Sequence, residues 1–255
     1  MIVSIASQKG GTGKTTTSIA LAAGLARKGK NVLLIDLDSQ ANSSKVLLPH
    51  YKDIKKDQTV YSTIIKRLPL TIHPTPIHHL DIIAAHILLS STDVELTVAK
   101  DHREARLKRE LDTIKARYDF IFIDCPPALG WLTLNALTAS DKVIVVVSPG
   151  YFEVEAIDQI ADTIRETKTD YNPELELIGL LFTMTDQTIN TSTSLSILKQ
   201  LYPTLLLPRQ IPRNTDIRDA HYNHQDIFSF NPKAYAAIAY EKLIDELFLS
   251  QEPTV

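Results

Sequence analysis

The stretch Gln8-Lys9-Gly10-Gly11-Thr12-Gly13-Lys14-Thr15-Thr16 decides the fold of this chain. It lies between an apolar run at residues 2–6 and a pattern at residues 16–28 in which apolar side chains recur at helical spacing. Consecutive glycines allow backbone N–H groups to turn inward around phosphate oxygens, and the start of a helix adds partial positive charge at the same point. The stretch therefore predicts a phosphate-binding loop between a strand and a helix.

The side chains of this loop extend the prediction. We expect Lys14 to reach the β- and γ-phosphates of a nucleotide and the Thr15 hydroxyl to bind Mg²⁺. The residues expected to contact the nucleotide are Lys9, Gly10, Gly11, Thr12, Gly13, Lys14, Thr15 and Thr16. The strict Walker A pattern fails at Gln8, which stands where the first glycine of that pattern belongs. The alternative is a plain glycine turn with a solvated lysine, which the preceding strand and the following helix disfavour.

Apolar runs of strand length continue along the chain. They cover residues 2–6, 32–35, 80–84, 120–123, 143–147 and 177–182. Runs this rich in β-branched residues are typical of parallel strands buried on both faces. Helical patterns at residues 94–117, 153–168 and 191–201 provide the crossovers. We predict an α/β fold, a doubly wound and mostly parallel sheet with helices on both faces, which forms one domain over residues 1–255.

Composition excludes several classes of protein. The chain has 255 residues, 44% of them hydrophobic, and a net charge of -3, which is unlike a disordered chain. A single cysteine, Cys125, excludes an internal disulfide or a four-thiolate zinc site, and we expect it to be a buried spacer. The start lacks a secretion signal and no apolar run reaches the ~20 residues of a membrane helix. We expect a cytoplasmic protein.

Three regions outside the strands lead to further expectations. Residues 49–79 indicate a helix flanked by loops, residues 203–232 a mostly irregular segment, and residues 232–249 an amphipathic helix that packs on the fold.

A group of cations is expected to form an exposed, ion-paired face on the helix at 94–117. Its members are Lys100, Arg103, Arg106, Lys108 and Arg109. The histidines at 73, 78, 79, 221 and 224 are expected at the surface rather than around a metal.

Two of the expected strands end in aspartate. Asp36 and Asp38 follow the second run, and Asp124 follows the fourth in an apolar-strand-to-aspartate pattern typical of a Walker B motif. Ligands of open α/β sheets lie at the carboxyl ends of the strands. We expect Asp124 to hold a metal ion, and one aspartate of the first pair to support Mg²⁺ while the other holds an attacking water. The alternative is a pair of turn-forming aspartates.

Lys9 is unusual, because a second lysine inside the glycine loop sets two like charges together unless an anion lies between them. The string from Lys9 to Thr16 resembles the deviant Walker A box of the ParA/MinD family of ATPases, and Asp124-Cys125-Pro126-Pro127-Ala128-Leu129-Gly130 resembles the ParA branch. The resemblance implies ATP and Mg²⁺ as cofactors and a dimer with two nucleotides between its subunits. In that dimer Lys9 would reach the partner's nucleotide.

The resemblance also implies roles for later residues. It assigns Asp38 to the attacking water and Asp36 to the magnesium shell, although Ser39 replaces the proline usual in this motif. It places Met184, Pro212 and Asn214 beside the adenine. An arginine that the family often carries after Asp186 is missing here.

A Soj-like member of the ParA branch without an N-terminal DNA-binding domain is the expectation that follows. Such an ATPase hydrolyses ATP slowly alone, binds nucleoid DNA without sequence preference and is stimulated by a ParB-like cargo adaptor. The candidate DNA contacts are Lys199, Arg213, Arg218 and Lys233, with a solvated surface as the alternative. The cargo would be a plasmid or chromosome, or alternatively a protein assembly such as a microcompartment.

Other classes remain as alternatives. A MinD-like membrane switch needs a basic amphipathic tail, whereas residues 236–249 are acidic, so we expect no membrane partner. An iron-protein-like electron carrier needs two cysteines per subunit. A small-molecule kinase or ligase would not need Lys9.

Overall fold

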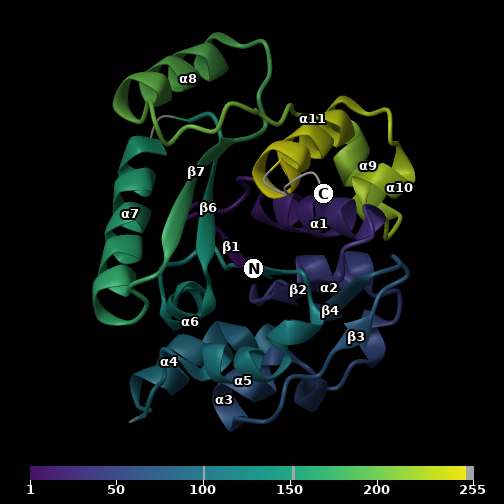
Figure 1. The fold of residues 1–255 in the computed structure, drawn as a ribbon, viewed down its shortest axis with the longest axis vertical. Coiled ribbons are helices and arrows are strands. Elements are labelled where there is room, and N and C mark those ends of the chain that lie inside the picture. The colour runs from purple at the N-terminus through teal and green to yellow at the C-terminus, as the bar shows by residue number, and fades with distance from the viewer. Residues whose placement is uncertain (100, 151–152, 251–255) are drawn as a thin grey trace.

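Seven strands form one sheet in the computed structural model, which describes residues 1–99, 101–150 and 153–250 (Figure 1). The strand order is β3-β4-β2-β5-β1-β6-β7, and every neighbouring pair is parallel except β3–β4. The strands are β1 (Ile2–Ala6), β2 (Val32–Asp36), β3 (His73–Pro74), β4 (Leu80–Ile83), β5 (Phe120–Asp124), β6 (Lys142–Val147) and β7 (Glu176–Phe182). The predicted doubly wound, mostly parallel fold is confirmed; the short antiparallel edge strand β3 was not expected.

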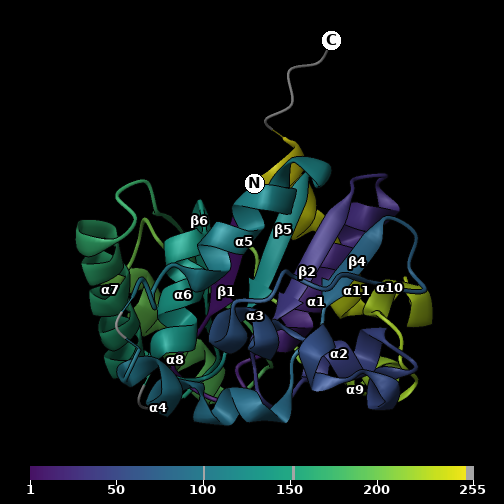
Figure 2. The ribbon, with the colours of Figure 1, turned by 90° about the horizontal axis from the view of Figure 1, so that it is seen from below.

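Helices cover both faces of this sheet (Figures 1 and 2). One face carries α1, α2, α10 and α11, and the other carries α3 to α8. The helices are α1 (Lys14–Arg27), α2 (Asn42–Leu47), α3 (Val60–Lys66), α4 (Thr92–Thr97), α5 (Arg106–Ile114), α6 (Trp131–Ala139), α7 (Glu153–Asp170), α8 (Ile189–Leu201), α9 (Thr215–Tyr222), α10 (Ile227–Phe230) and α11 (Tyr235–Ile244). None of those in the described residues has the length and apolar character needed to cross a membrane.

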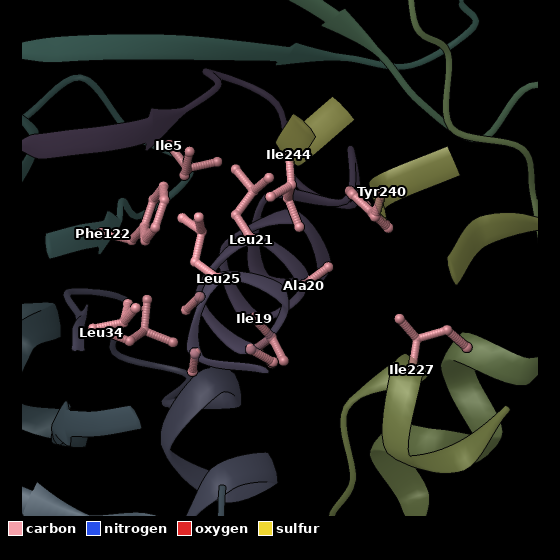
Figure 3. Close-up of a cluster of buried hydrophobic side chains, with 14 of the residues drawn as sticks. Ile5, Ile19, Ala20, Leu21, Leu25, Leu34, Phe122, Ile227, Tyr240 and Ile244 are labelled. Atoms are coloured by element: carbon pink, nitrogen blue, oxygen red, sulfur yellow. The ribbon is translucent and has the colours of Figure 1, made fainter. Parts of the chain in front are cut away.

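The core has two halves because side chains alternate between the faces of each strand. Ile5 and Phe122 point toward α1, whereas Ile35 and Ile123 point toward α3 to α8. Figure 3 shows the first half, in which the sheet lies on one side of α1 and α11 on the other. Strands buried on both faces explain the uninterrupted apolar runs of the sequence.

Helix α1 is enclosed on every side by apolar groups. Its middle section, Ala20 to Gly24, consists of small residues and leucine, and all are buried. Small side chains let α11 approach closely, and the Tyr240 hydroxyl of α11 lies 2.9 Å from the Thr17 hydroxyl. The C-terminal helix therefore packs on the fold, as expected, and continues past Ile244 as one π-helical turn.

The prediction of one helix over residues 94–117 is wrong. The chain leaves α4 after Thr97 and starts α5 at Arg106. Between them the Arg103 guanidinium donates to the carbonyl oxygens of Leu96 and Thr97 and lies 4.0 Å from the ring centre of Trp131. Arg103 therefore lies between the helices, whereas Arg106, Lys108 and Arg109 share α5, where Arg106 pairs with Asp101, so the expected single cationic face is split. Lys100 lies outside the described residues.

The segment at residues 203–232 is mostly irregular, as predicted, but it contains two short helices, α9 and α10, that were not expected. Asn214 caps α9 by accepting a hydrogen bond from the Asp216 amide at 2.7 Å. Asp226 caps α10 by accepting from the amides of Phe228 and Ser229. Both are good N-cap residues, and the prolines nearby masked that signal.

Candidate functional site

The phosphate loop joins β1 to α1 in the geometry that its glycines allow. Gly11 and Gly13 have φ angles of 76° and 90°, a left-handed region that other residues rarely adopt. The residue that follows β7 holds the loop in place, because the Thr183 hydroxyl donates to the Thr12 carbonyl oxygen at 2.6 Å. The Thr12 hydroxyl is buried without a hydrogen-bond partner among the described residues. The glycines, Lys14, Thr15 and Thr16 line the cavity above the loop, as a phosphate cradle requires.

The two lysines of the loop differ in exposure. Lys14 is buried, its Nζ donates to the Lys9 carbonyl oxygen at 3.1 Å, and burial lowers the pKa of its ammonium group against the opposing charges of Asp124 and Asp38. Lys9, by contrast, is exposed. Lys14 therefore lines the site of its own loop, and Lys9 lies at the surface.

Asp36 and Asp124 lie opposite each other in the pairing of β2 and β5, and both are buried. Asp124 accepts hydrogen bonds from Ser18 at 3.2 Å and Ser43 at 2.7 Å, and from the Thr15 hydroxyl. Burial, and then the repulsion between the two carboxylates, raise the pKa of Asp36; burial likewise raises the pKa of Asp124. A cation near Asp124 and Thr15 would offset the repulsion between these buried carboxylates, so the residues present fit a divalent metal ion.

Asp36 and Asp38 take different positions, although they are only two residues apart. The Asp36 carboxylate accepts from the amide and hydroxyl of Ser44, each at 2.8 Å, and from the Asp38 amide at 3.1 Å. Asp38 is half-buried and lines the cavity above the phosphate loop with Lys14. Its carboxylate accepts from the Gln40 amide at 2.9 Å, so the turn closes without the usual proline.

Two adjoining cavities lie above the loop. The cavity of about 540 Å³ is lined by the loop itself, Asp38, Asn42 and Lys45, among others. The cavity of about 450 Å³ contains the three residues expected beside adenine, namely Met184, Pro212 and Asn214. They meet because the segment after Ile211 pairs with Thr185, whose amide donates to the Ile211 carbonyl oxygen at 3.1 Å.

The four candidate DNA contacts are not brought together. Lys199 lies on α8, on the other side of the molecule from α9 in both views (Figures 1 and 2). Arg213 and Arg218 line the smaller cavity, and Lys233 precedes α11 at the surface. His221 is half-buried and lines both cavities, so its expected place at the open surface is wrong.

Several residues of the site carried no signal in the sequence. Ser18, Ser43 and Ser44 bind the buried carboxylates, and Thr183 holds the loop. Serine and threonine are too common for such roles to be recognised without the fold. Cys125 is buried, as expected, and this burial raises the pKa of its thiol to about 12.

The loop, the buried lysine and the two strand-end carboxylates define a P-loop nucleotide-binding protein. A family model described as an AAA domain matches residues 1–177. The chain is 38% identical to the sporulation initiation inhibitor protein Soj of Bacillus subtilis, over 96% of this chain and 97% of Soj. It is 35% identical to the chromosome partitioning protein ParA of Myxococcus xanthus, over 99% and 89% of the two chains. The chain belongs to the ParA/MinD family of ATPases, in the Soj-like ParA branch.

Solved structures show the same relationship. Cobyrinic acid a,c-diamide synthase of Mycobacterium smegmatis with bound ADP and magnesium is 30% identical, with a TM-score of 0.80 and coverage of 96% of this chain and 92% of the synthase. A protein of Borrelia burgdorferi described as a plasmid partition protein, bound to AMPPNP, is 29% identical, with a TM-score of 0.82 and coverage of 98% and 99%. The P-loop fold is therefore shared with nucleotide-bound proteins.

Proposed function

We propose that this protein, one domain over residues 1–255, binds and hydrolyses ATP with Mg²⁺ in the larger cavity. Gly10, Gly11, Thr12, Gly13 and Thr16 provide the backbone cradle, and Lys14 neutralises the phosphates. The metal ion, when bound, neutralises charge on the β- and γ-phosphates. Thr15 and Asp124 would hold the ion. Asp36, which lies opposite Asp124 in the pairing of β2 and β5, would add its negative charge nearby while it remains bonded to Ser44. The half-buried Asp38 is the residue placed to orient the attacking water.

The observation that carries the proposal is the opposite exposure of Lys9 and Lys14. One loop needs only one lysine to neutralise its own phosphates. A second lysine that is exposed can act on a nucleotide bound by another subunit. We infer a dimer with two nucleotides at its interface, in which Lys9 acts on the partner's ATP. An isolated subunit then lacks one charge of the transition-state clamp, which in comparable systems costs on the order of 10³–10⁵ in rate.

A switch of this kind would serve partition. The relatives named Soj, chromosome partitioning protein ParA and plasmid partition protein support this class of function. We infer that the ATP-bound dimer binds nucleoid DNA non-specifically in the cytoplasm. A ParB-like adaptor on the cargo then stimulates hydrolysis, which releases the ATPase from the DNA. All four DNA candidates are exposed, but Arg213 and Arg218 also line the smaller cavity, whereas Lys199 and Lys233 line neither cavity.

DNA binding in different nucleotide states tests the proposal. Wild type and Asp38→Ala are titrated with non-specific plasmid DNA in ATP, in ADP and without nucleotide, at low and high salt. We expect Asp38→Ala to bind DNA only with ATP, to bind less as salt rises and to hydrolyse little. Asp57→Ala, at an exposed position away from both cavities, is the control and should match wild type. Equal binding of Asp38→Ala in ATP and ADP would contradict the switch.

A further inference from the structure

The two cavities share a seam, which is lined by the residues common to both. These residues are Gly13, Thr16, Met184, Arg218 and His221. One cavity is mainly apolar and the other contains the phosphate loop, so a nucleotide that spans them has its base in the first and its phosphates in the second. Its sugar lies between base and phosphates, and therefore at the seam.

Three polar side chains lie at the seam: Thr16, which belongs to the phosphate loop, and Arg218 and His221 on α9, of which His221 is the better fixed. The Arg218 side chain is 82% exposed and its Nε lies 3.7 Å from an Asp219 carboxylate oxygen, so it is free to swing. His221 is half-buried on α9, a helix capped by Asn214 and tied to the following segment by the bond from Asn231 to the Asp216 carboxylate at 2.7 Å.

The surroundings of His221 also set its chemistry. Burial lowers the pKa of the imidazole, and the charge of the buried Asp226 opposes this shift only in part. A neutral imidazole carries one N–H donor and one acceptor nitrogen. A sugar hydroxyl is likewise both donor and acceptor, so the two groups are complementary. No local pattern indicates this role, because His221 lies about 200 positions after Lys14 along the chain.

We propose that His221 hydrogen-bonds to a sugar hydroxyl of the bound nucleotide and makes this site select ribonucleotides over 2′-deoxyribonucleotides. The inference rests on the proposed nucleotide binding and deepens it, since it assigns substrate selection to a residue of α9. The contact also links α9 to the bound nucleotide. Figure 2 shows α9 beside α2, and the His224 ring bonds to the Lys45 carbonyl oxygen at 2.8 Å.

Calorimetric titration of ADP and 2′-deoxy-ADP with Mg²⁺ tests the proposal without relying on hydrolysis. We expect wild type to bind ADP roughly 5–10-fold more tightly than 2′-deoxy-ADP, which is the loss of one hydrogen bond. His221→Ala should lose most of this preference by weakening ADP alone. His221→Gln, which keeps a donor and an acceptor, should retain part of it. His50→Ala, at an exposed histidine outside both cavities, should behave as wild type.

The possible failures are distinguishable. If wild type binds ADP but shows no preference over 2′-deoxy-ADP, the inference about His221 is wrong and the proposed function stands. The same holds if His221→Ala keeps the wild-type preference. If wild type binds neither nucleotide, the proposed function fails and the inference fails with it. The wild-type comparison changes only the ligand, so it does not depend on any variant folding.

Discussion

The contact between α1 and α11 gives a prediction in which two effects have opposite signs. Alanine in place of glycine inside a helix stabilises that helix by about 1 kcal/mol. At Gly24, however, the new methyl carbon would lie 2.3 Å from Cδ1 of Ile244 and 3.2 Å from Cε2 of Phe228. Carbon atoms prefer separations of about 3.5–4.0 Å. The structure therefore predicts a clash at a position that helix propensity alone would mark for improvement.

The magnitude follows from comparing the two effects. Overpacking of a close-packed core costs about 1–3 kcal/mol. The atom met at 2.3 Å is the end of the Ile244 side chain, which is buried and can turn away only into a close-packed core, while Phe228 closes the next approach, so the cost belongs in the upper part of that range. After the gain in helix propensity, Gly24→Ala should lower the free energy of unfolding by about 1–2 kcal/mol. Equilibrium urea unfolding, compared at equal slopes, measures this change.

A second substitution isolates the cause. Ile244→Val removes the Cδ1 atom and alone should cost about 0.5–1.5 kcal/mol. Combined with Gly24→Ala, it should restore stability relative to Gly24→Ala, because the new methyl fills the space that Cδ1 leaves. The reasoning is refuted if Gly24→Ala is as stable as wild type, or if the two losses simply add.

Three more predictions concern the site. Without nucleotide, the raised pKa values of Asp36 and Asp124 mean that the folded chain holds protons that the unfolded chain gives up, so the free energy of unfolding falls as pH rises above about 4. Asp124→Asn should flatten the resulting decline of melting temperature with pH. An unchanged slope of melting temperature against pH would contradict this. Thr183→Val leaves the Thr12 carbonyl oxygen without its 2.6 Å donor and should lower the free energy of unfolding by about 1–3 kcal/mol in urea titrations, whereas an unchanged value would mean that the bond is replaced. Cys125 should react with a thiol reagent such as Ellman's only after denaturation, since it is 1% exposed; rapid reaction of the native protein would count against this.

The parts of the fold predicted from sequence are those with strong local signals. The six strands of the parallel sheet were predicted because burial on both faces leaves uninterrupted apolar runs. The break between α4 and α5 was missed because it depends on Arg103 meeting Trp131, which is distant in sequence. The helices α9 and α10 were missed because prolines around them suggested a loop.

The same division applies to the site. The loop from Lys9 to Thr16 is contiguous, so its spacing alone predicts a phosphate cradle. Met184, Pro212 and Asn214 were found through the family resemblance, and the structure places them in one cavity. His221 and Thr183 reach the site only through the packing of α9 and β7, so no pattern along the chain could indicate them.

Mixing two inactive variants tests the central claim, that Lys9 acts on the nucleotide of a second subunit. Lys9→Ala and Asp38→Ala should each release little phosphate from ATP with Mg²⁺ and plasmid DNA. In an equal mixture half of the dimers pair one variant with the other, and each such dimer has one complete site, with Asp38 from one subunit and Lys9 from its partner. We predict about a quarter of the wild-type rate per subunit in the mixture. No recovery on mixing, or full activity of Lys9→Ala alone, would contradict the account.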